Sequence, residues 1–436
     1  MLFCIGTGEP GAPAPAEGGG SVLRLLSNQN FNPTRLIVVS FGAIILLGTF
    51  LLHLPISARD GQFTPWLTCL FTATSATCVT GLVLVDSALH WTPFGQGVIL
   101  AMIQLGGLGF VSLISLIPLL LRRRIGLSQR LAIASAFNLN GMSGVVRVVR
   151  HALMGTFLLE GCGAILLATR FVPLFGWGRG LWYSIFHSVS AFCNAGFDLM
   201  GEHTGAFSSL AGFREDPVVL GTIGCLIVLG GLGFFVWEDC LEHRSWRRLS
   251  FYSRMVLAVT GALILGGWLF FLGAEWNNLE TLGGMTAGEK VGNALFQSVT
   301  LRTAGYSVLD QGALREGAAA LSVVLMLIGG SSGSTAGGMK VSRVLILWKS
   351  LVRELKRMVH PNHVSVIKVD GQPVEERVVS STGAYIMAYM VVLLAGALVV
   401  SWDNYGFQES FAASLTCISN VRPALGILGP MENLSI

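Results

Sequence analysis

Four short segments of the chain resemble one another and recur at a regular spacing. Three of them read ATCVTGLV, AFCNAGFD and LRTAGYSV, around Gly81, Gly196 and Gly305. The fourth, LTCISNVRPALG, has Arg422 where the others have glycine. Self-similarity with a period of about 110 residues indicates that a chain is built from repeated structural units. We therefore expect four units of similar length, the last of which departs from the pattern at one residue.

Each unit contains a long apolar stretch followed by a shorter one. About 20 apolar residues are enough for a helix to cross a bilayer, whereas about 14 are too few. We therefore expect each unit to have a membrane span and then a re-entrant helix that enters the membrane and returns. The spans are predicted at 36–56, 150–172, 253–273 and 378–400, and the re-entrant helices at 65–79, 181–194, 289–303 and 407–420.

The composition also indicates a membrane protein. Charged residues make up 12% of the chain, whereas soluble proteins contain about 25%. A glycine-rich apolar stretch closes each of the first three units, and we expect the fourth unit to lack this closing span. The predicted fold is an all-α integral membrane protein in which four span, re-entrant-loop, span repeats surround a pseudo-fourfold pore.

Runs of basic residues predict how the chain is oriented in the membrane, and the composition of the N-terminal segment predicts where the first unit begins. Arginine and lysine runs, such as RRR at 122–124 and KSLVRELKR at 349–357, follow the closing stretches, and such runs are typical of cytoplasmic loops. We expect a multi-pass protein of the cytoplasmic (inner) membrane whose N-terminus is cytoplasmic. The predicted divisions are a disordered N-terminal tail at 1–34, rich in Pro, Gly and Ala, pore repeats at 35–125, 126–248 and 249–358, and a partial pore repeat at 359–436.

Several other classes of protein are not supported by the sequence. The basic runs lack the interleaved aromatic residues of a nucleic-acid-binding surface, and the eight cysteines form no CxxC pair or metal-ligand spacing. The histidines are scattered without a nucleophile or base at useful spacing. We therefore expect no enzyme, no covalent cofactor and no nucleic-acid partner.

The regular recurrence of the glycines along the chain has a physical use in ion transport. Irregular backbone at membrane depth is tolerated only where protein buries it or where it lines a cavity. Four turns that meet on one axis would form a ring of carbonyl oxygens, which can replace the hydration shell of a cation. Glycine suits such turns because it adopts positive φ without a steric penalty. Asp86, Asp198 and Asp310 follow the glycines and either attract cations to the pore mouth or are ordinary loop charges.

The segments TSATCVTGL, HSVSAFCNAGFD, LRTAGY, LGGLGF and GGSSGSTAGGMK resemble the membrane subunit of the Trk/Ktr potassium-uptake family, over residues 33 to about 433. The resemblance implies a homodimer that takes up K⁺, with Na⁺ as a second candidate ion. It also implies that a cytosolic ring of nucleotide-binding regulatory subunits gates this homodimer. It implies that a selectivity filter binds the ion through backbone carbonyls. The filter residues carried over are Val79, Thr80, Gly81, Asn194, Ala195, Gly196, Thr303, Ala304, Gly305, Ser419, Asn420 and Val421.

The same resemblance makes residues 329–340 an intramembrane gate beneath the filter. Small residues in the middle of an apolar span unwind the helix, and a nucleotide-binding Gly-Lys-Ser/Thr ending is missing here. Lys340 either senses the ion or the partner, or extends its amine to the membrane surface. The gate residues are Gly329, Gly330, Gly333, Gly337, Gly338 and Lys340.

Two charged residues within apolar surroundings require separate interpretation. Glu160 lies in a predicted span, where an acid is expensive, and we expect it to be paired within the protein. Arg422 would repel a potassium ion 4 Å away by about 4 kcal/mol at an effective dielectric constant of about 20. Its Cβ would add about 1 kcal/mol of strain if φ were positive there.

Three interpretations of Arg422 remain open. In the first, the chain is a truncated or altered version of a working transporter in which Arg422 turns towards the outer vestibule. In the second, it is a non-conducting membrane scaffold or regulatory paralogue. In the third, Arg422 is a tethered cation that plugs the pore until something displaces it.

Overall fold

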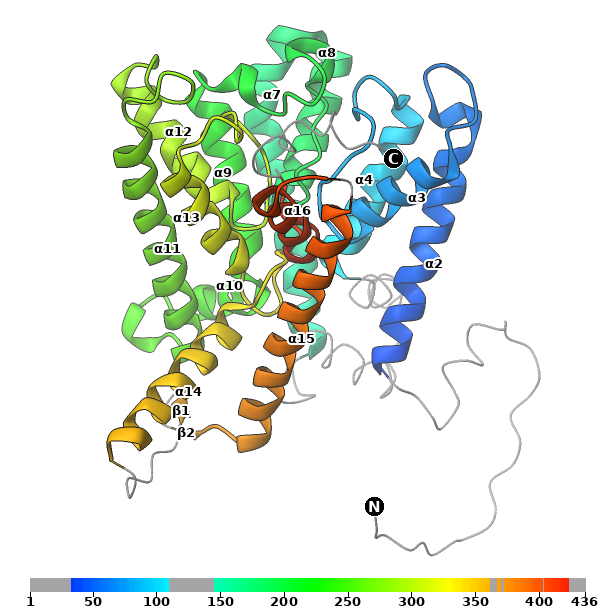
Figure 1. Ribbon diagram of the computed structural model, residues 1–436. Coiled ribbons are helices and arrows are strands. Elements are labelled where there is room, and N and C mark those ends of the chain that lie inside the picture. Colours follow the sequence, from blue (N-terminus) through cyan, green and yellow to red (C-terminus); the bar gives the residue numbers. More distant parts are fainter. Residues whose placement is uncertain (1–32, 110–144, 361–366, 370–371, 403, 423–436) are drawn as a thin grey trace, which may run out of the picture.

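The computed structural model describes residues 33–109, 145–360, 367–369, 372–402 and 404–422 (Figure 1). The predicted tail up to residue 32, the boundary at residue 125 and the predicted loss of a span after Arg422 lie outside these residues. The described chain is mostly helical. Its only strands are β1 (Lys368–Val369) and β2 (Gln372–Pro373), which pair antiparallel.

Four long helices begin the four units. They are α2 (Pro33–His53), α7 (Val145–Phe192), α11 (Phe251–Glu275) and α15 (Glu376–Ser401). Among the described helices, α7, α11 and α15 are each long and apolar enough to cross a membrane. The spans predicted at 150–172, 253–273 and 378–400 lie within these three helices, as expected from their length and composition.

Four short helical arms follow the long helices. They are α3 (Trp66–Thr77), the end of α7, α12 (Ala287–Thr300) and α16 (Phe407–Ser419). In α7 the arm continues the long helix after a break at Gly176, where φ is 78° and ψ is 169°. Pro173 precedes this break, and proline removes a helical hydrogen bond. The predicted helices at 150–172 and 181–194 are therefore two arms of one bent element.

The next helix ends at a glycine in the first unit, Gly109, and is interrupted in the second and third units. The first unit has α4 (Pro93–Leu108), and the second has α9 (Pro217–Leu232) and α10 (Phe234–Glu242), which meet at 92°. Gly233 makes this bend possible because its φ is 87°. In the third unit, residues 328–340 separate α13 (Glu316–Leu327) from α14 (Val341–Val359). The short elements η1 (Pro55–Ser57), α8 (Gly201–Thr204), η2 (Ala211–Phe213) and η3 (Trp246–Arg248) lie in the connections.

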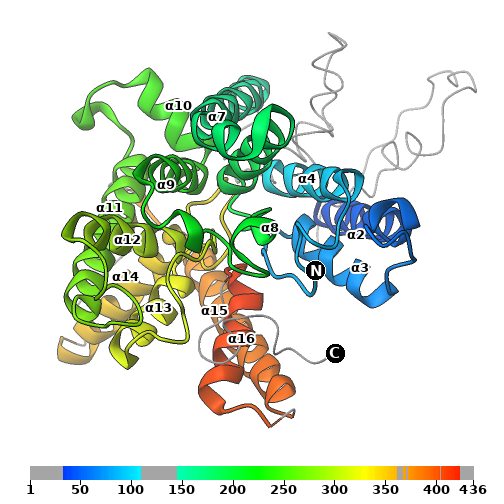
Figure 2. The same ribbon diagram turned by 90° about the horizontal axis from the view of Figure 1, so that it is seen from above.

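Seen from above, four groups of helices surround a common centre in the order of the chain (Figure 2). One packing contact recurs in three of the groups. A serine of the short arm donates a hydrogen bond to a backbone carbonyl of the long helix, at 2.6–2.8 Å, and a glycine three residues further along that helix leaves room for the serine. The sets are Ser188 with Glu160 and Gly163, Ser298 with Ile264 and Gly267, and Ser414 with Leu393 and Gly396.

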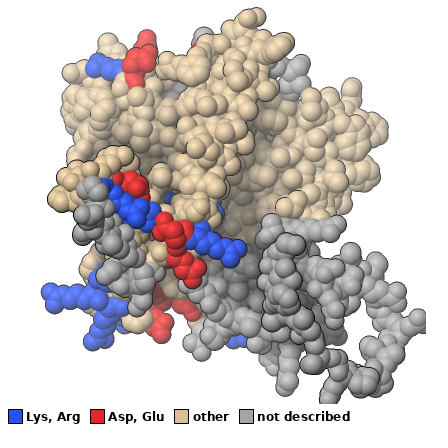
Figure 3. Space-filling view, turned by 60° about the horizontal axis from the view of Figure 1, so that its bottom comes forward, with Lys and Arg blue, Asp and Glu red and all other residues tan. Residues whose placement is uncertain are grey.

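Exposed basic side chains gather at one end of the molecule, beside α11 and α14. Arg244, Arg247 and Arg248 precede α11, and Lys356 and Arg357 lie in the last turn of α14; all five are exposed. Figure 3 shows lysine and arginine at this lower end, whereas the wall above it carries few charges. This distribution suits a membrane protein with one basic face.

The recurring serine contact predicts different effects for two neighbouring glycines of α11. Replacement of Gly267 by alanine would place a methyl group on Ser298 and lower stability by about 1–3 kcal/mol. Replacement of Gly266, which has no neighbouring atom within 4 Å at that position, removes a poor helix former and raises stability by up to about 1 kcal/mol. Thermal unfolding of the detergent-solubilised protein measures both, and equal midpoints for the two variants would contradict the contact.

Candidate functional site

The four short arms end near the centre, and each is followed by an irregular loop. We name these loop 1 (78–83), loop 2 (193–198), loop 3 (301–306) and loop 4 (420–422). Consecutive loops are so close that a side chain on the glycine of one would overlap with the next. The pairs are Gly81 with Ala195, Gly196 with Ala304, and Gly305 with Arg422.

Loops 4 and 1 also touch, and this contact closes a ring. Thr80 Oγ1 donates a hydrogen bond to Asn420 Oδ1 at 3.2 Å. The ring therefore runs through loops 1, 2, 3 and 4 and back to loop 1. All of the residues predicted to bind the ion are brought together here, including Ser419 at the end of α16.

The backbone of the four loops follows a common path. Two residues before each glycine position, and before Arg422, φ is positive: 59° at Val79, 58° at Asn194, 80° at Thr303 and 53° at Asn420. The next N–H groups turn back to the preceding arm, as in the hydrogen bonds from Thr80 to Ser75 and from Ala195 to Ser190, both 2.8 Å. The loops are thus held by their own helices.

This arrangement leaves buried carbonyl oxygens open. Among the described residues, no hydrogen bond reaches the carbonyls of Thr80, Ala195 or Ala304, and these residues are at most 8% exposed. An unpaired buried carbonyl is costly unless another partner satisfies it. Each arm also points its C-terminal end, the negative end of the helix dipole, at the ring. The ring can therefore hold a dehydrated cation.

The acidic residues behind the glycines have three different environments. Asp86 is buried and accepts hydrogen bonds from the backbone N–H groups of Ala88, Leu89 and Phe207, at 2.8–2.9 Å. Asp198 is buried and paired, whereas Asp310 is exposed. Asp86 is therefore a structural acceptor, and of the three acids only Asp310 is exposed to solvent.

Arg422 lies inside the ring and is 5% exposed. Its Nη1 donates to Asp198 Oδ2 at 3.2 Å and lies 3.5 Å from the carbonyl oxygen of Gly196. Among the described non-glycine residues, Arg422 is not one of those with positive φ. The predicted backbone strain at Arg422 is therefore wrong, because the chain adopts a different turn where glycine is missing.

The predicted gate, residues 329–340, lies directly against loops 2 and 4 and forms, with Ile328, the interruption between α13 and α14. Its two ends are tied by hydrogen bonds between Gly329 and Met339 (3.0 Å) and between Met339 and Leu327 (3.1 Å). Thr335 Oγ1 donates to the Phe192 carbonyl at 3.0 Å and accepts from Asn194 Nδ2 at 2.9 Å. A side chain on Gly337 would meet loop 4. Gate and ring are therefore in direct contact.

Two cationic side chains hold this segment from within. Lys340 Nζ donates to the Ala336 carbonyl, so it bonds inside the segment rather than extending away. Arg302, which the sequence argument did not single out, donates from Nη2 to the Gly329 carbonyl at 3.0 Å and is 8% exposed. Among the described residues, no carboxylate pairs with Arg302 or Lys340. The sequence did contain a signal for Arg302, because it is a charged residue next to the predicted filter residue Thr303 in an apolar chain.

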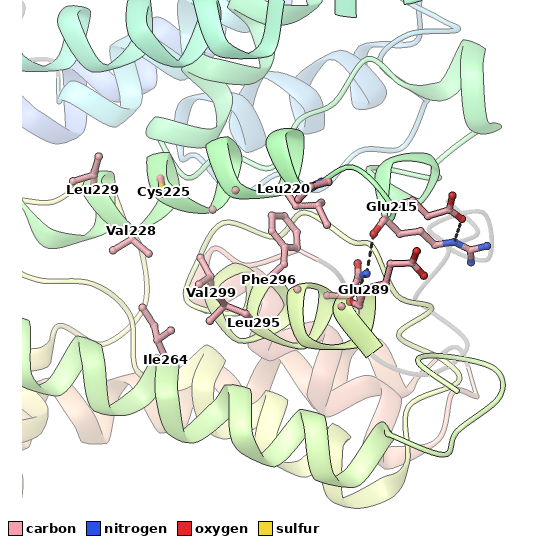
Figure 4. Close-up of a pocket in the computed structure, with 17 residues that line it drawn as sticks. Glu215, Leu220, Cys225, Val228, Leu229, Ile264, Glu289, Leu295, Phe296 and Val299 are labelled. Carbon is pink, nitrogen blue, oxygen red and sulfur yellow. Dashed lines mark hydrogen bonds and ion pairs between the residues drawn. The ribbon is translucent and has the colours of Figure 1, made fainter. Parts of the chain in front are cut away.

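Two cavities lie outside the ring. One of about 810 Å³ lies between α9, α11 and α12 (Figure 4) and contains none of the predicted site residues. Another of about 450 Å³ lies between α4 and α7 and is lined by Glu160. Gln104 Nε2 donates to both carboxylate oxygens of Glu160 at 3.1 and 3.2 Å, so the predicted pairing of Glu160 is confirmed.

The fold and the ring define a class of multi-pass membrane protein with a buried ring of loops whose carbonyl oxygens include several without a hydrogen bond among the described residues. Within the described residues, no cluster of His, Cys, Asp and Glu could hold a metal ion. Residues 27–435 match the sequence model of the TrkH family, described as "Cation transport protein". The chain belongs to this family.

Individual relatives and one solved structure agree with this assignment. The chain is 40% identical to the potassium/sodium uptake protein NtpJ of Enterococcus hirae, over 75% of this chain and 71% of that protein. It is 38% identical to the Ktr system potassium uptake protein B of Bacillus subtilis, over 75% and 72%. The crystal structure of the potassium transporter TrkH from Vibrio parahaemolyticus has the same fold, with a TM-score of 0.74 and 21% identity, over 94% of this chain and 80% of that chain.

The environments of the acids predict which of them supports the fold. Replacement of Asp86 by alanine leaves three backbone N–H groups without their acceptor and is expected to lower stability by about 3 kcal/mol. Replacement of Asp310, which is exposed and accepts one N–H, is expected to change it by less than about 1 kcal/mol. The unfolding midpoint in detergent tests this, and a stable Asp86→Ala protein would refute the structural role.

Proposed function

We propose that this chain is the membrane subunit of a potassium uptake system and that K⁺ crosses the membrane through the ring of four loops. The observation that carries the proposal is the ring itself, which has buried carbonyl oxygens without a hydrogen bond and four helix ends directed at it. Membership of the cation transport family and the potassium uptake for which the relatives are named support potassium as the ion. Sodium is a second candidate ion because one relative is named for both.

The proposed filter consists of the carbonyl groups of loops 1 to 4, in a pseudo-fourfold arrangement of four repeats. Dehydrated K⁺ is stabilised there because the carbonyl dipoles replace its water. Three loops supply a glycine at the crowded contact with the next loop, and loop 4 supplies Arg422 instead.

The proposed gate is the segment 328–340. It lies where α13 and α14 are interrupted, and it touches loops 2 and 4 on the side of the ring that faces α14. Closure and opening then amount to a change in the hydrogen bonds that Arg302 and Thr335 make.

The remaining assignments concern the assembly. We place the basic end and the N-terminus in the cytoplasm, in the inner membrane, and we retain the unit boundaries at residues 125, 248 and 358. We also propose that the chain forms a homodimer and works with a cytosolic nucleotide-binding regulatory subunit, which the resemblance to the Trk/Ktr family supports. No observation favours the non-conducting scaffold.

Uptake of rubidium-86 into potassium-loaded proteoliposomes tests the function. We expect uptake above that of protein-free vesicles, with competition by external K⁺. Gly196→Ala is expected to lower it at least tenfold, because a methyl group would overlap with the Ala304 carbonyl at a residue whose φ is 68°. Gly261→Ala, which has open space around it, is the matched control and should leave uptake unchanged. Rubidium uptake that survives Gly196→Ala would place the ion path elsewhere.

Hydrogen–deuterium exchange of the detergent-solubilised protein tests the gate independently of transport. Arg302→Met removes the donor to the Gly329 carbonyl, so the amides of residues 328–340 are expected to exchange several-fold faster. Arg302→Lys keeps a cationic donor and should show a smaller effect. Unchanged exchange in Arg302→Met would mean that this arginine does not hold the gate.

A further inference from the structure

The side chain of Arg422 reaches a loop that is not its neighbour. In the ring, loop 4 touches loop 3 through Gly305 and loop 1 through Thr80. The guanidinium of Arg422, however, bonds to Asp198 and approaches the Gly196 carbonyl, both of which belong to loop 2. Loop 2 is opposite loop 4 in the ring, so the side chain extends from one side of the ring to the other.

The guanidinium lies on the side of the ring that faces away from the gate. After Gly196 the chain continues past Asp198 to α8, at the upper end of Figure 1, whereas the gate and the basic end lie below. The side chains of Arg422 and Asp198 are each 6% exposed. The charged group is therefore enclosed by the loops and does not extend into solvent, which contradicts the interpretation that Arg422 turns towards the outer vestibule.

We propose that the Arg422 guanidinium occupies the outermost cation position of the ring, where it takes the place of a transported ion and limits uptake; this inference rests on the potassium-uptake function proposed above. The position is built for a monovalent cation, with the Gly196 carbonyl and the Asp198 carboxylate as its ligands. An arginine remains charged at any physiological pH, so a second cation is repelled from this place whenever the side chain is there.

The acid that holds the guanidinium is specific to loop 2. The residue two positions after Gly196 is Asp198, whereas Val83 and Ser307 occupy the corresponding places after Gly81 and Gly305. The one loop with a carboxylate at this place thus lies opposite the one loop with an arginine. A glycine at position 422 would leave this carboxylate facing an open site, which K⁺, Rb⁺ or a free guanidinium ion could fill.

Rubidium-86 uptake into proteoliposomes provides the first test. We expect Arg422→Gly to transport at least ten times faster than the unmodified chain, and Arg422→Lys to remain slow because it keeps the charge. Arg179→Gln removes an exposed arginine that pairs with Glu202 of α8 and should transport like the unmodified chain. Millimolar guanidinium chloride is expected to inhibit Arg422→Gly, to have no effect on the unmodified chain, and to lose its effect when Asp198→Asn is added to Arg422→Gly.

Cation-dependent thermal stability provides a second readout that needs no transport. A ligand that binds the folded state raises the unfolding midpoint, so K⁺, Rb⁺ or guanidinium at up to about 20 mM, balanced with choline, should stabilise Arg422→Gly more than the unmodified chain. Equal uptake and equal cation stabilisation in the two proteins would overturn the inference and leave the uptake function intact. Extra cation binding by Arg422→Gly without uptake in any variant would support the occupation of a cation position by Arg422, but it would refute the proposed function and, with it, the limit on uptake.

Discussion

The need to satisfy irregular backbone inside a membrane protein determines most of this structure. Each of the four loops turns the first of its N–H groups back to the helix before it, as Thr80 and Ala195 do, which gives these donors a partner within the protein. The carbonyl oxygens then have only the neighbouring loop and the centre of the ring to face. Close approach of the loops leaves no room for a side chain at Gly81, Gly196 or Gly305. The glycines are thus required by packing before any ion is considered, and the proposed ion site uses the carbonyl oxygens that the packing leaves open.

The sequence predicted the elements whose signals are local. The short arms, the glycine positions and the interruption at 328–340 followed from lengths of apolar stretches and from runs of small residues. Positive φ at Asn194 and Asn420 has a weak local signal, since asparagine tolerates this conformation, but Val79 has none and is imposed by the loop. The turn at Arg422 and its partner Asp198 could not be predicted, because they depend on two loops that lie 224 residues apart in the chain. Arg302 was missed although its charge within an apolar chain was a local signal, because its partner, the Gly329 carbonyl, is known only from the structure.

Glu160 illustrates how a repeated contact can contain one polar exception. The carbonyls of Glu160 and Ile264 accept equivalent serine hydrogen bonds, so the two residues occupy corresponding places. Gln104 and Val228 also correspond, since each lies two residues before a glycine, Gly106 or Gly230, that packs on the end of a short arm. One interface thus has a carboxylate and an amide where the other has two apolar side chains. Because Gln104 donates to both carboxylate oxygens, the exchange is compensated within the interface, and the cavity beside it has no need of an ion.

Among the described residues, three cationic side chains lie close to the ring, and they differ in whether an acidic side chain pairs with them. Arg302 and Lys340 donate to carbonyl groups of the gate segment and, within the described residues, have no carboxylate beside them. Arg422 alone has an acid, Asp198, and this acid comes from the opposite loop. Burial of an ion pair costs far less free energy than burial of one unpaired charge, because each partner compensates the charge of the other. Arg422 and Asp198 are therefore best understood as one unit: the acid makes the arginine acceptable inside the ring, and the arginine replaces the cation that the acid would otherwise attract.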